Sequence, residues 1–163
     1  AWIDQPPRLL QRLESIRYAV AERIGLGPPV PEALKVAIVA SPATYVTSSG
    51  VTIDADEFDI AARIVSVGRA HHAYTVTGAI CTAIAALIPG TLVNQQLRGK
   101  APSEVVRIGH PAGTIEIGVE MEQRDGSLYP RRVTTYRTAR RIMQGQVYIP
   151  ADALALSEIK VGA

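Results

Sequence analysis

The sequence predicts an α+β domain in which a curved, mostly antiparallel sheet wraps around one buried central helix. The run at residues 77–88 carries no charge, which is typical of a helix that other elements enclose on every face. Short β-branched segments lie on both sides of this run, separated by glycine, proline and Asp-Gly turn signals. An amphipathic pattern near the beginning of the chain predicts one further helix.

The first expected element is this amphipathic helix, at residues 7–25. Pro6-Pro7 stands at its start, Gly25 and Gly27 end it, and apolar side chains recur near the 3.6-residue period. Residues 26–31 are too rich in proline for regular structure and predict a linker. The apolar positions of the helix are Leu9, Leu10, Leu13, Ile16, Val20 and Ile24.

Three strands are expected around the central helix. Residues 35–40 form a short, continuous apolar run, which suits a buried strand. Residues 58–67 fit both an alternating strand and one face of a helix, and we favour a strand that turns at Gly68. After Pro89-Gly90 ends the central helix, residues 91–93 return as a strand.

The second half of the sequence predicts hairpins. Residues 104–108 and 114–122 flank a turn at residues 109–113. The second of these strands alternates apolar and acidic side chains, so one of its faces is solvated. Asp125-Gly126 makes the next turn. The strands expected after this turn are residues 132–138 and 144–150.

Composition excludes several classes of protein. The 163 residues are 47% hydrophobic and 20% charged, which fits one globular domain with a real core. A net charge of +2 and an aromatic content of 5% argue against a nucleic-acid partner. The longest apolar run is shorter than the roughly 20 residues of a membrane span, and no signal peptide is recognised. The single cysteine fits a reducing compartment, so the expected location is cytoplasmic.

The start of the central helix is the first candidate binding site. The N–H groups of a first turn lack helical acceptors and carry partial positive charge, so they can bind a carboxylate or a phosphate. Thr75 and Thr77 add hydroxyl groups there, and Val76 and Gly78 complete the turn. Cys81 follows within the apolar run, and we expect it in the core, where burial would raise the pKa of its thiol.

Histidines and a hydroxyl-rich loop supply the other candidates. His72 could donate to a substrate carboxylate, shuttle a proton near neutral pH, or cap a neighbouring carbonyl. His71 is the weaker candidate, because successive side chains of an extended segment face opposite ways. His110 could contact a ligand or only orient its turn.

Ser49 could donate to an anion or simply be solvated. Ala112 and Gly113 follow His110, and Gly113 would let the backbone approach a ligand closely.

No metal site is expected. The chain has three histidines, at positions 71, 72 and 110, and spacings of one and 38 match no usual structural ligand pattern.

Three motifs resemble one known family in the right order. They are AHHAYTVTGAI at residues 70–80, GHPAGT at residues 109–114 and YRTARRIMQGQVY at residues 136–148. Together they look like the C-terminal half of the 2-methylaconitate cis-trans isomerase and 3-methylitaconate isomerase family, of which 4-oxalomesaconate tautomerase is a more distant member. The resemblance covers nearly the whole chain, from the helix at residues 7–25 onward.

The resemblance implies a fold similar to diaminopimelate epimerase, with two alike domains facing each other across the active site. A full member needs roughly twice this length, so residues 1–163 are interpreted as a single domain, the C-terminal half of a two-domain enzyme. Residues 1–27 would form the helix and linker and residues 33–163 the epimerase-like half-barrel. The family's Cys-Gly-Asn motif and catalytic lysine, expected in the missing N-terminal domain, have no counterpart here. We therefore expect the chain alone to be inactive.

The implied reaction is a cofactor-independent 1,3-allylic proton shift in an unsaturated di- or tricarboxylate, such as methylaconitate or methylitaconate. This domain would supply anion binding, with His72 as the proton-transfer candidate. Epimerase relatives carry a catalytic cysteine where Thr75 stands, and a hydroxyl cannot replace that thiolate. The alternative is a non-catalytic carboxylate-binding or assembly module of the same fold. An apolar face left by the missing domain also predicts self-association, so a homo-oligomer stays open.

Overall fold

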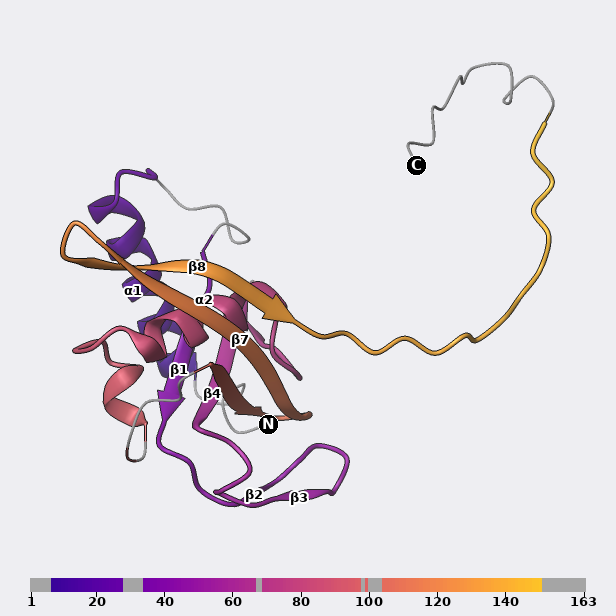
Figure 1. Cartoon of the computed structure of the whole chain (residues 1–163), viewed down its shortest axis with the longest axis horizontal. Helices are drawn as coiled ribbons and strands as arrows, with labels where there is room; N and C mark the ends of the chain where they lie inside the picture. The colour runs from indigo at the N-terminus through magenta and orange to yellow at the C-terminus, as the bar shows by residue number, and fades with distance from the viewer. Residues whose placement is uncertain (1–6, 28–33, 67–68, 98, 100–103, 151–163) are drawn as a thin grey trace.

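The computed structural model of the chain describes residues 7–27, 34–66, 69–97, 99 and 104–150. Its class is α+β, as expected: a strongly curled sheet holds one helix on its inner face, and a second helix lies outside the sheet (Figure 1). The turn expected at Gly68 and most of the expected linker at residues 26–31 lie outside the described residues.

The main sheet has the strand order β1-β4-β6-β7-β8, with the short β5 also pairing with β4. The described pairs are antiparallel except β4 with β6, which is parallel. A separate two-stranded hairpin is formed by β2 and β3. The strands are β1 (Val36–Ala40), β2 (Tyr45–Val46), β3 (Thr52–Ile53), β4 (Ile60–Ser66), β5 (Arg69–Ala70), β6 (Val105–His110), β7 (Gly113–Arg124) and β8 (Ser127–Thr135).

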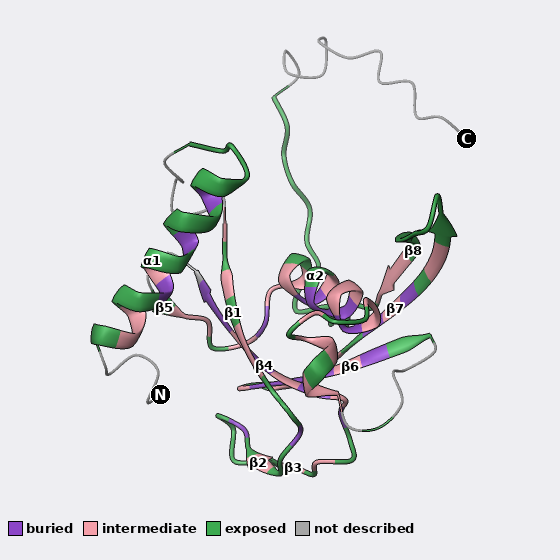
Figure 2. Cartoon of the chain, turned by 90° about the vertical axis from the view of Figure 1, so that its left-hand side faces the viewer, coloured by how far each residue is buried: buried purple, intermediate pink, exposed green. Residues whose placement is uncertain are grey.

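The outer helix α1 (Pro7–Arg23) confirms the amphipathic pattern. One stripe of the helix, formed by Leu13, Arg17 and Ala21, is buried, and α1 contacts β1 (Figure 2). Ile16, with 46% of its surface exposed, lies outside this stripe. The buried stripe is therefore narrower than the apolar pattern predicts.

The inner helix α2 (Val76–Leu87) forms the core with the sheet. Small side chains, Ala79, Ala83 and Ala86, make its buried face and let it lie close to β6 and β7. The sheet residues of this core are Ile60, Ala62 and Ile64 from β4, Val106 and Ile108 from β6, and Ile117 and Val119 from β7.

The expectation that this helix is enclosed on every face is wrong. Thr77 and Cys81 are exposed, so the described residues cover only one side of α2 (Figure 2). A helix with an apolar sequence is stabilised by burial, but the sequence does not say which protein segment covers each face. The placement of Cys81 in the core is wrong for the same reason.

Two expected strands are absent from the described residues. After α2, the hydroxyl of Thr91 donates to the carbonyl of Ala85 at 2.6 Å, which holds the chain in a turn before the 3₁₀ helix η2 (Asn94–Gln96). Residues 136–150 form no regular structure and run away from the sheet (Figure 1). A strand needs a neighbouring strand for its main-chain hydrogen bonds. β8 ends at Thr135, and no described strand pairs with the residues that follow it.

The expected hairpins are confirmed. β6 and β7 are joined through residues 110–113, and β7 and β8 through Asp125-Gly126. Asp125 has φ 47° and Gly126 has φ 79°, the pair of positive values that a type I′ turn requires. Within the described residues, no helix is long and apolar enough to cross a membrane.

Gly109 should tolerate no side chain. A Cβ there would lie 2.8 Å from Phe58 Cδ2, and the Phe58 ring is 2% exposed and cannot move aside. We expect Gly109→Ala to lower the free energy of unfolding by about 1–3 kcal/mol through overpacking, measured by urea denaturation. Gly145→Ala, with no atom within 4 Å of the added Cβ, is the control and should change it by less than about 0.5 kcal/mol. Equal stability of the two variants would contradict this packing.

Candidate functional site

The main sheet has a gap at one edge of β4. β1 pairs with one edge of this strand, so β6 and β5 must share the other. β6 pairs as far as Ala61 with Gly109, and β5 pairs from Val65 with Ala70. Residues 62–64 lie between these two pairings. We call this gap, with the His71 and His110 residues that border it, the strand junction.

Three basic side chains belong to the strand junction. His71 follows β5 and its N–H donates to the carbonyl of Ile64 at 2.8 Å. His110 is the last residue of β6. Arg63 comes from β4 between them, and its Nη1 donates to the carbonyl of Ala62 at 2.7 Å and to that of Gly109 at 3.3 Å. Arg63 thus links the two parallel strands where they separate.

The start of α2 lies beside the same gap. A Cβ on Gly78 would overlap Ile64 Cδ1, so glycine lets the first turn of the helix contact β4 directly. Thr75 is the N-cap, and its Oγ1 accepts the N–H of Gly78 at 3.2 Å. The helix start is thereby fixed against the strand that carries Arg63.

This cap changes the set of donors expected for a ligand. The N–H of Gly78 is occupied by Thr75, so it is not available to an anion. Among the described residues, the N–H groups of Val76 and Thr77 have no recorded acceptor, as the first turn of a helix requires. Thr77 is exposed, so this end of the helix is open to solvent.

His71 and His72 do not face opposite ways, contrary to expectation. Their rings stack with centroids 4.9 Å apart and an interplanar angle of 14°. The segment bends here instead of extending, and the N–H of Ala73 donates to Nδ1 of His71 at 3.2 Å. Both histidines therefore lie at the strand junction, with His72 more exposed.

His110 is 8% exposed and lies in an electropositive surrounding. Burial lowers its pKa from the ordinary value, and the positive charges of Arg63 and His71 act in the same direction. The N–H of Ala112 donates to Nδ1 of His110 at 3.2 Å, which assigns the proton of the neutral ring to Nε2. The ring also makes a backbone hydrogen bond to Thr114, which acts on the pKa in the opposite direction. His110 is thus tied to its own turn at Ala112 and Thr114.

The loop that carries Ser49 lies against the turn after His110. The N–H of Ser48 donates to the carbonyl of Pro111 at 2.8 Å. The hydroxyl of Tyr45 donates to the carbonyls of His110 at 3.0 Å and Gly113 at 2.5 Å. Ser49 Oγ lies 3.0 Å from the hydroxyl oxygen of Thr47. The sequence candidates thus form two neighbouring groups, one around His71 and α2 and one around this turn.

Sequence reasoning missed Arg63 and Tyr45. The Arg63 guanidinium lies 5.4 Å from the centroid of the Tyr45 ring. A signal was present, because Arg63 is a lone charge inside the apolar run of residues 60–65. Its position at a gap between strands follows only from the sheet topology.

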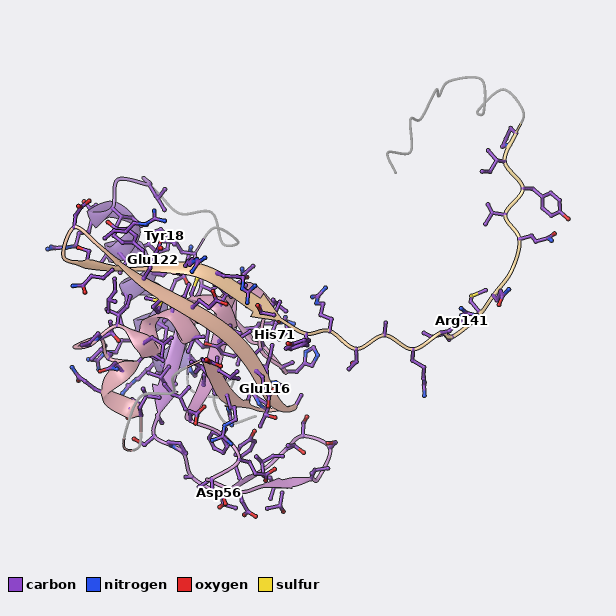
Figure 3. The ribbon with its side chains drawn as sticks, viewed as in Figure 1. Tyr18, Asp56, His71, Glu116, Glu122 and Arg141 are labelled. Carbon is purple, nitrogen blue, oxygen red and sulfur yellow. The ribbon has the colours of Figure 1, made fainter. Side chains whose placement is uncertain are left out.

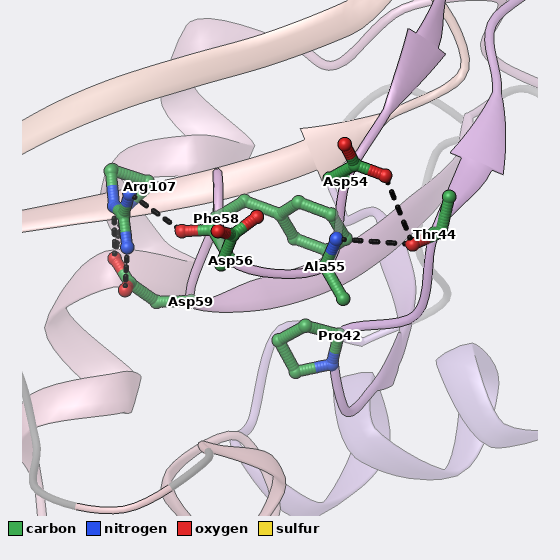
Figure 4. Close-up of a pocket in the computed structure, with 8 residues that line it drawn as sticks. All are labelled: Pro42, Thr44, Asp54, Ala55, Asp56, Phe58, Asp59 and Arg107. Carbon is green, nitrogen blue, oxygen red and sulfur yellow. Dashed lines mark hydrogen bonds and ion pairs between the residues drawn. The ribbon is translucent and has the colours of Figure 1, made fainter.

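A cavity of about 490 Å³ lies elsewhere, lined by Asp54, Asp56 and Asp59 together with Arg107 (Figure 4). Arg107 Nη2 is 2.9 Å from Asp59 Oδ1, so its charge is already paired. The cavity would repel a carboxylate ligand, and Figure 3 shows Asp56 well separated from His71. In the described parts of the chain, no three His, Cys, Asp or Glu side chains are grouped to hold a metal ion.

The curled sheet around α2 is a diaminopimelate epimerase-like fold, and comparison with known proteins specifies the family. The model of the family described as PrpF protein matches residues 1–150. The chain belongs to this family.

Named relatives and a solved structure support this family assignment. The chain is 40% identical over 154 residues to the 2-methyl-aconitate isomerase of Shewanella oneidensis, covering 91% of the chain and 38% of the relative. It is 40% identical over 149 residues to the 3-methylitaconate isomerase of Eubacterium barkeri, covering 86% and 38%. The crystal structure of methylitaconate-delta-isomerase aligns with a TM-score of 0.76 and 38% identity, covering 96% of this chain and 42% of that one. The chain thus spans about two fifths of the length of these relatives.

The lowered pKa of His110 makes stability depend on pH. The unfolded chain binds the proton near pH 6.5, whereas the folded chain binds it only at lower pH. Stability is therefore complete above about pH 6.5 and falls as the pH drops through the folded pKa. We expect His110→Gln to flatten the pH dependence of the melting temperature between about pH 7 and pH 5. His72→Gln, at an exposed position, should keep the wild-type slope, and identical slopes for all three proteins would contradict the burial argument.

Proposed function

We propose that the chain is the domain of an isomerase that moves a double bond in an unsaturated di- or tricarboxylate by a 1,3-allylic proton shift. The observation that carries the proposal is the strand junction, where basic and donor groups gather in a member of a family whose curated relatives are named for methylaconitate and methylitaconate isomerisation. No cofactor is invoked, because the shift needs only proton transfer and stabilised negative charge.

The reaction makes three chemical demands. A proton leaves the carbon next to a carboxylate, the electron pair spreads over a dienolate, and a proton returns at the other end of the allylic unit. The open N–H groups of Val76 and Thr77 can stabilise the negative charge. His72, exposed beside the helix start, is the candidate for proton transfer.

The full activity is proposed to need a second domain of the same protein. The exposed face of α2 and the match to only about two fifths of each relative support this organisation. Residues 1–163 would then act as one domain, and the substrate would be held between the two.

We also propose a cytoplasmic location, supported by the lone, exposed thiol of Cys81, which persists most easily under reducing conditions.

Deuterium exchange tests the proposal. The protein that carries this chain, expressed at its natural length, is incubated in D₂O with methylaconitate or methylitaconate and followed by proton NMR. We expect deuterium at the allylic carbon together with the isomerised product. Binding without exchange at any pH would overturn the proposal and support a non-catalytic carboxylate-binding module.

His72→Gln tests the proton-transfer role. Loss of a general acid or base typically costs between 100-fold and 10,000-fold, so we expect kcat to fall at least about 100-fold with a small change in KM. Arg132→Gln, on the exposed β8 strand, is the control and should keep wild-type kinetics. An unchanged kcat in a folded His72→Gln variant would exclude His72 from proton transfer.

A further inference from the structure

We propose that Arg63 is a substrate-binding residue whose guanidinium takes one carboxylate of the substrate at the strand junction. The inference rests on the proposed function, since it assigns a binding group within that same site. It is independent of the proton-transfer role of His72.

Among the described arginines, Arg63 combines partial burial with the absence of a recorded acidic partner, whereas the other described arginines without a recorded ion pair are exposed. Arg107 pairs with Asp59, and Arg132 and Arg124 pair with Glu120 and Glu122. Among the described residues no ion pair is recorded for Arg63, although it is half-buried. A charge removed from water without a counter-charge is costly, and an anionic ligand would offset that cost.

Burial is the larger influence on this guanidinium and lowers its pKa, whereas Tyr45 acts in the opposite direction. The group remains charged because the ordinary value for arginine is far above neutrality. Burial and Tyr45 are the recorded influences on Arg63, and no acidic residue is among them. The positive charge of Arg63 thus has no recorded acidic counter-charge among the described residues.

The donors of Arg63 suit a carboxylate. Nη1 is occupied by the carbonyls of Ala62 and Gly109. In the described structure no acceptor is recorded for Nε or Nη2, and these two atoms form the side of the guanidinium that binds a carboxylate with two parallel hydrogen bonds. The Tyr45 ring, 5.4 Å from Cζ, fixes the guanidinium plane.

Neighbouring groups support an anion at the same point. His71 and His110 border the gap from opposite ends. The positive charges of Arg63 and His71 each lower the pKa of His110, so the three side chains share one electropositive region. The start of α2 contacts β4 one residue away from Arg63, through Gly78 and Ile64. A carboxylate at Arg63 would therefore meet a region with three basic side chains, in which no acidic residue is recorded as acting on Arg63.

A merely structural role is the competing explanation, since Arg63 also ties β4 to Gly109 of β6. That role predicts a loss of stability without selectivity for ligand charge. A binding role predicts a loss of affinity that depends on one particular carboxylate. The two explanations are separated by comparing ligands that differ only in that group.

The test uses the protein at its natural length and measures binding by calorimetry without turnover. The probes are the saturated acid propane-1,2,3-tricarboxylate and its monomethyl esters. We expect Arg63→Gln to weaken binding of the triacid about 10- to 100-fold, as loss of a charge-assisted, two-point contact requires. The monomethyl ester that masks the carboxylate bound by Arg63 should bind wild type and variant equally, because that ester cannot make the two-point contact with the guanidinium. Arg107→Gln is the matched control and should leave binding unchanged.

Arg63→Lys keeps the charge without the two-point geometry, so it should fold and lose less affinity than Arg63→Gln. If Arg63→Gln does not fold, as judged by its thermal melt, the same ester comparison is made with Arg63→Lys. Unchanged triacid affinity, or equal losses for the triacid and every ester, would overturn the role of Arg63. Arg63-dependent binding without deuterium exchange in wild type would instead overturn the isomerase proposal and leave this inference standing.

Discussion

The close packing of α2 on the sheet is the constraint on which the rest of the structure depends. Gly78 and the alanines of the buried helix face let the helix backbone approach β4, β6 and β7. Larger side chains there would push the helix outward by overpacking. Because Gly78 lies against Ile64, the first turn of the helix is fixed on the strand that also carries Arg63. Packing and electrostatics are therefore set by the same few residues.

The parallel pairing of β4 with β6 has a second consequence. An antiparallel sheet could continue without interruption, but here β6 and β5 meet the same edge of β4 from opposite ends. Main-chain groups in the gap need partners, and the Arg63 side chain supplies two hydrogen bonds to carbonyls there. Ligands of open α/β sheets bind in the crevice where strand connections diverge, and here too two strands leave one edge of β4 in different directions.

Local patterns predicted most of the regular structure. The helix at residues 7–25, the strands at 35–40 and 58–67 and the hairpin turn at Asp125-Gly126 all carry periodicity or turn chemistry that depends on neighbouring residues alone. The strand expected at residues 144–150 failed because a strand also needs a partner, which hydrophobic alternation does not provide. The expectation that α2 is enclosed on every face failed for a related reason: composition shows that a face is apolar but not what covers it.

The candidate site was predictable only in part, and the missing part is the more instructive. The run AHHAYTVTGAI drew attention to the helix start, because unpaired amides and histidines are recognisable from sequence. The position of Arg63 in the site depends on a long-range contact, because its Nη1 donates to the carbonyl of Gly109, 46 positions away in the sequence. The acidic residues Asp54, Asp56 and Asp59 gather in the separate cavity with Arg107, where they would repel an anion. Negative charge on one side and unpaired positive charge at the junction together favour one direction of approach for a carboxylate, since like charges raise and opposite charges lower its free energy.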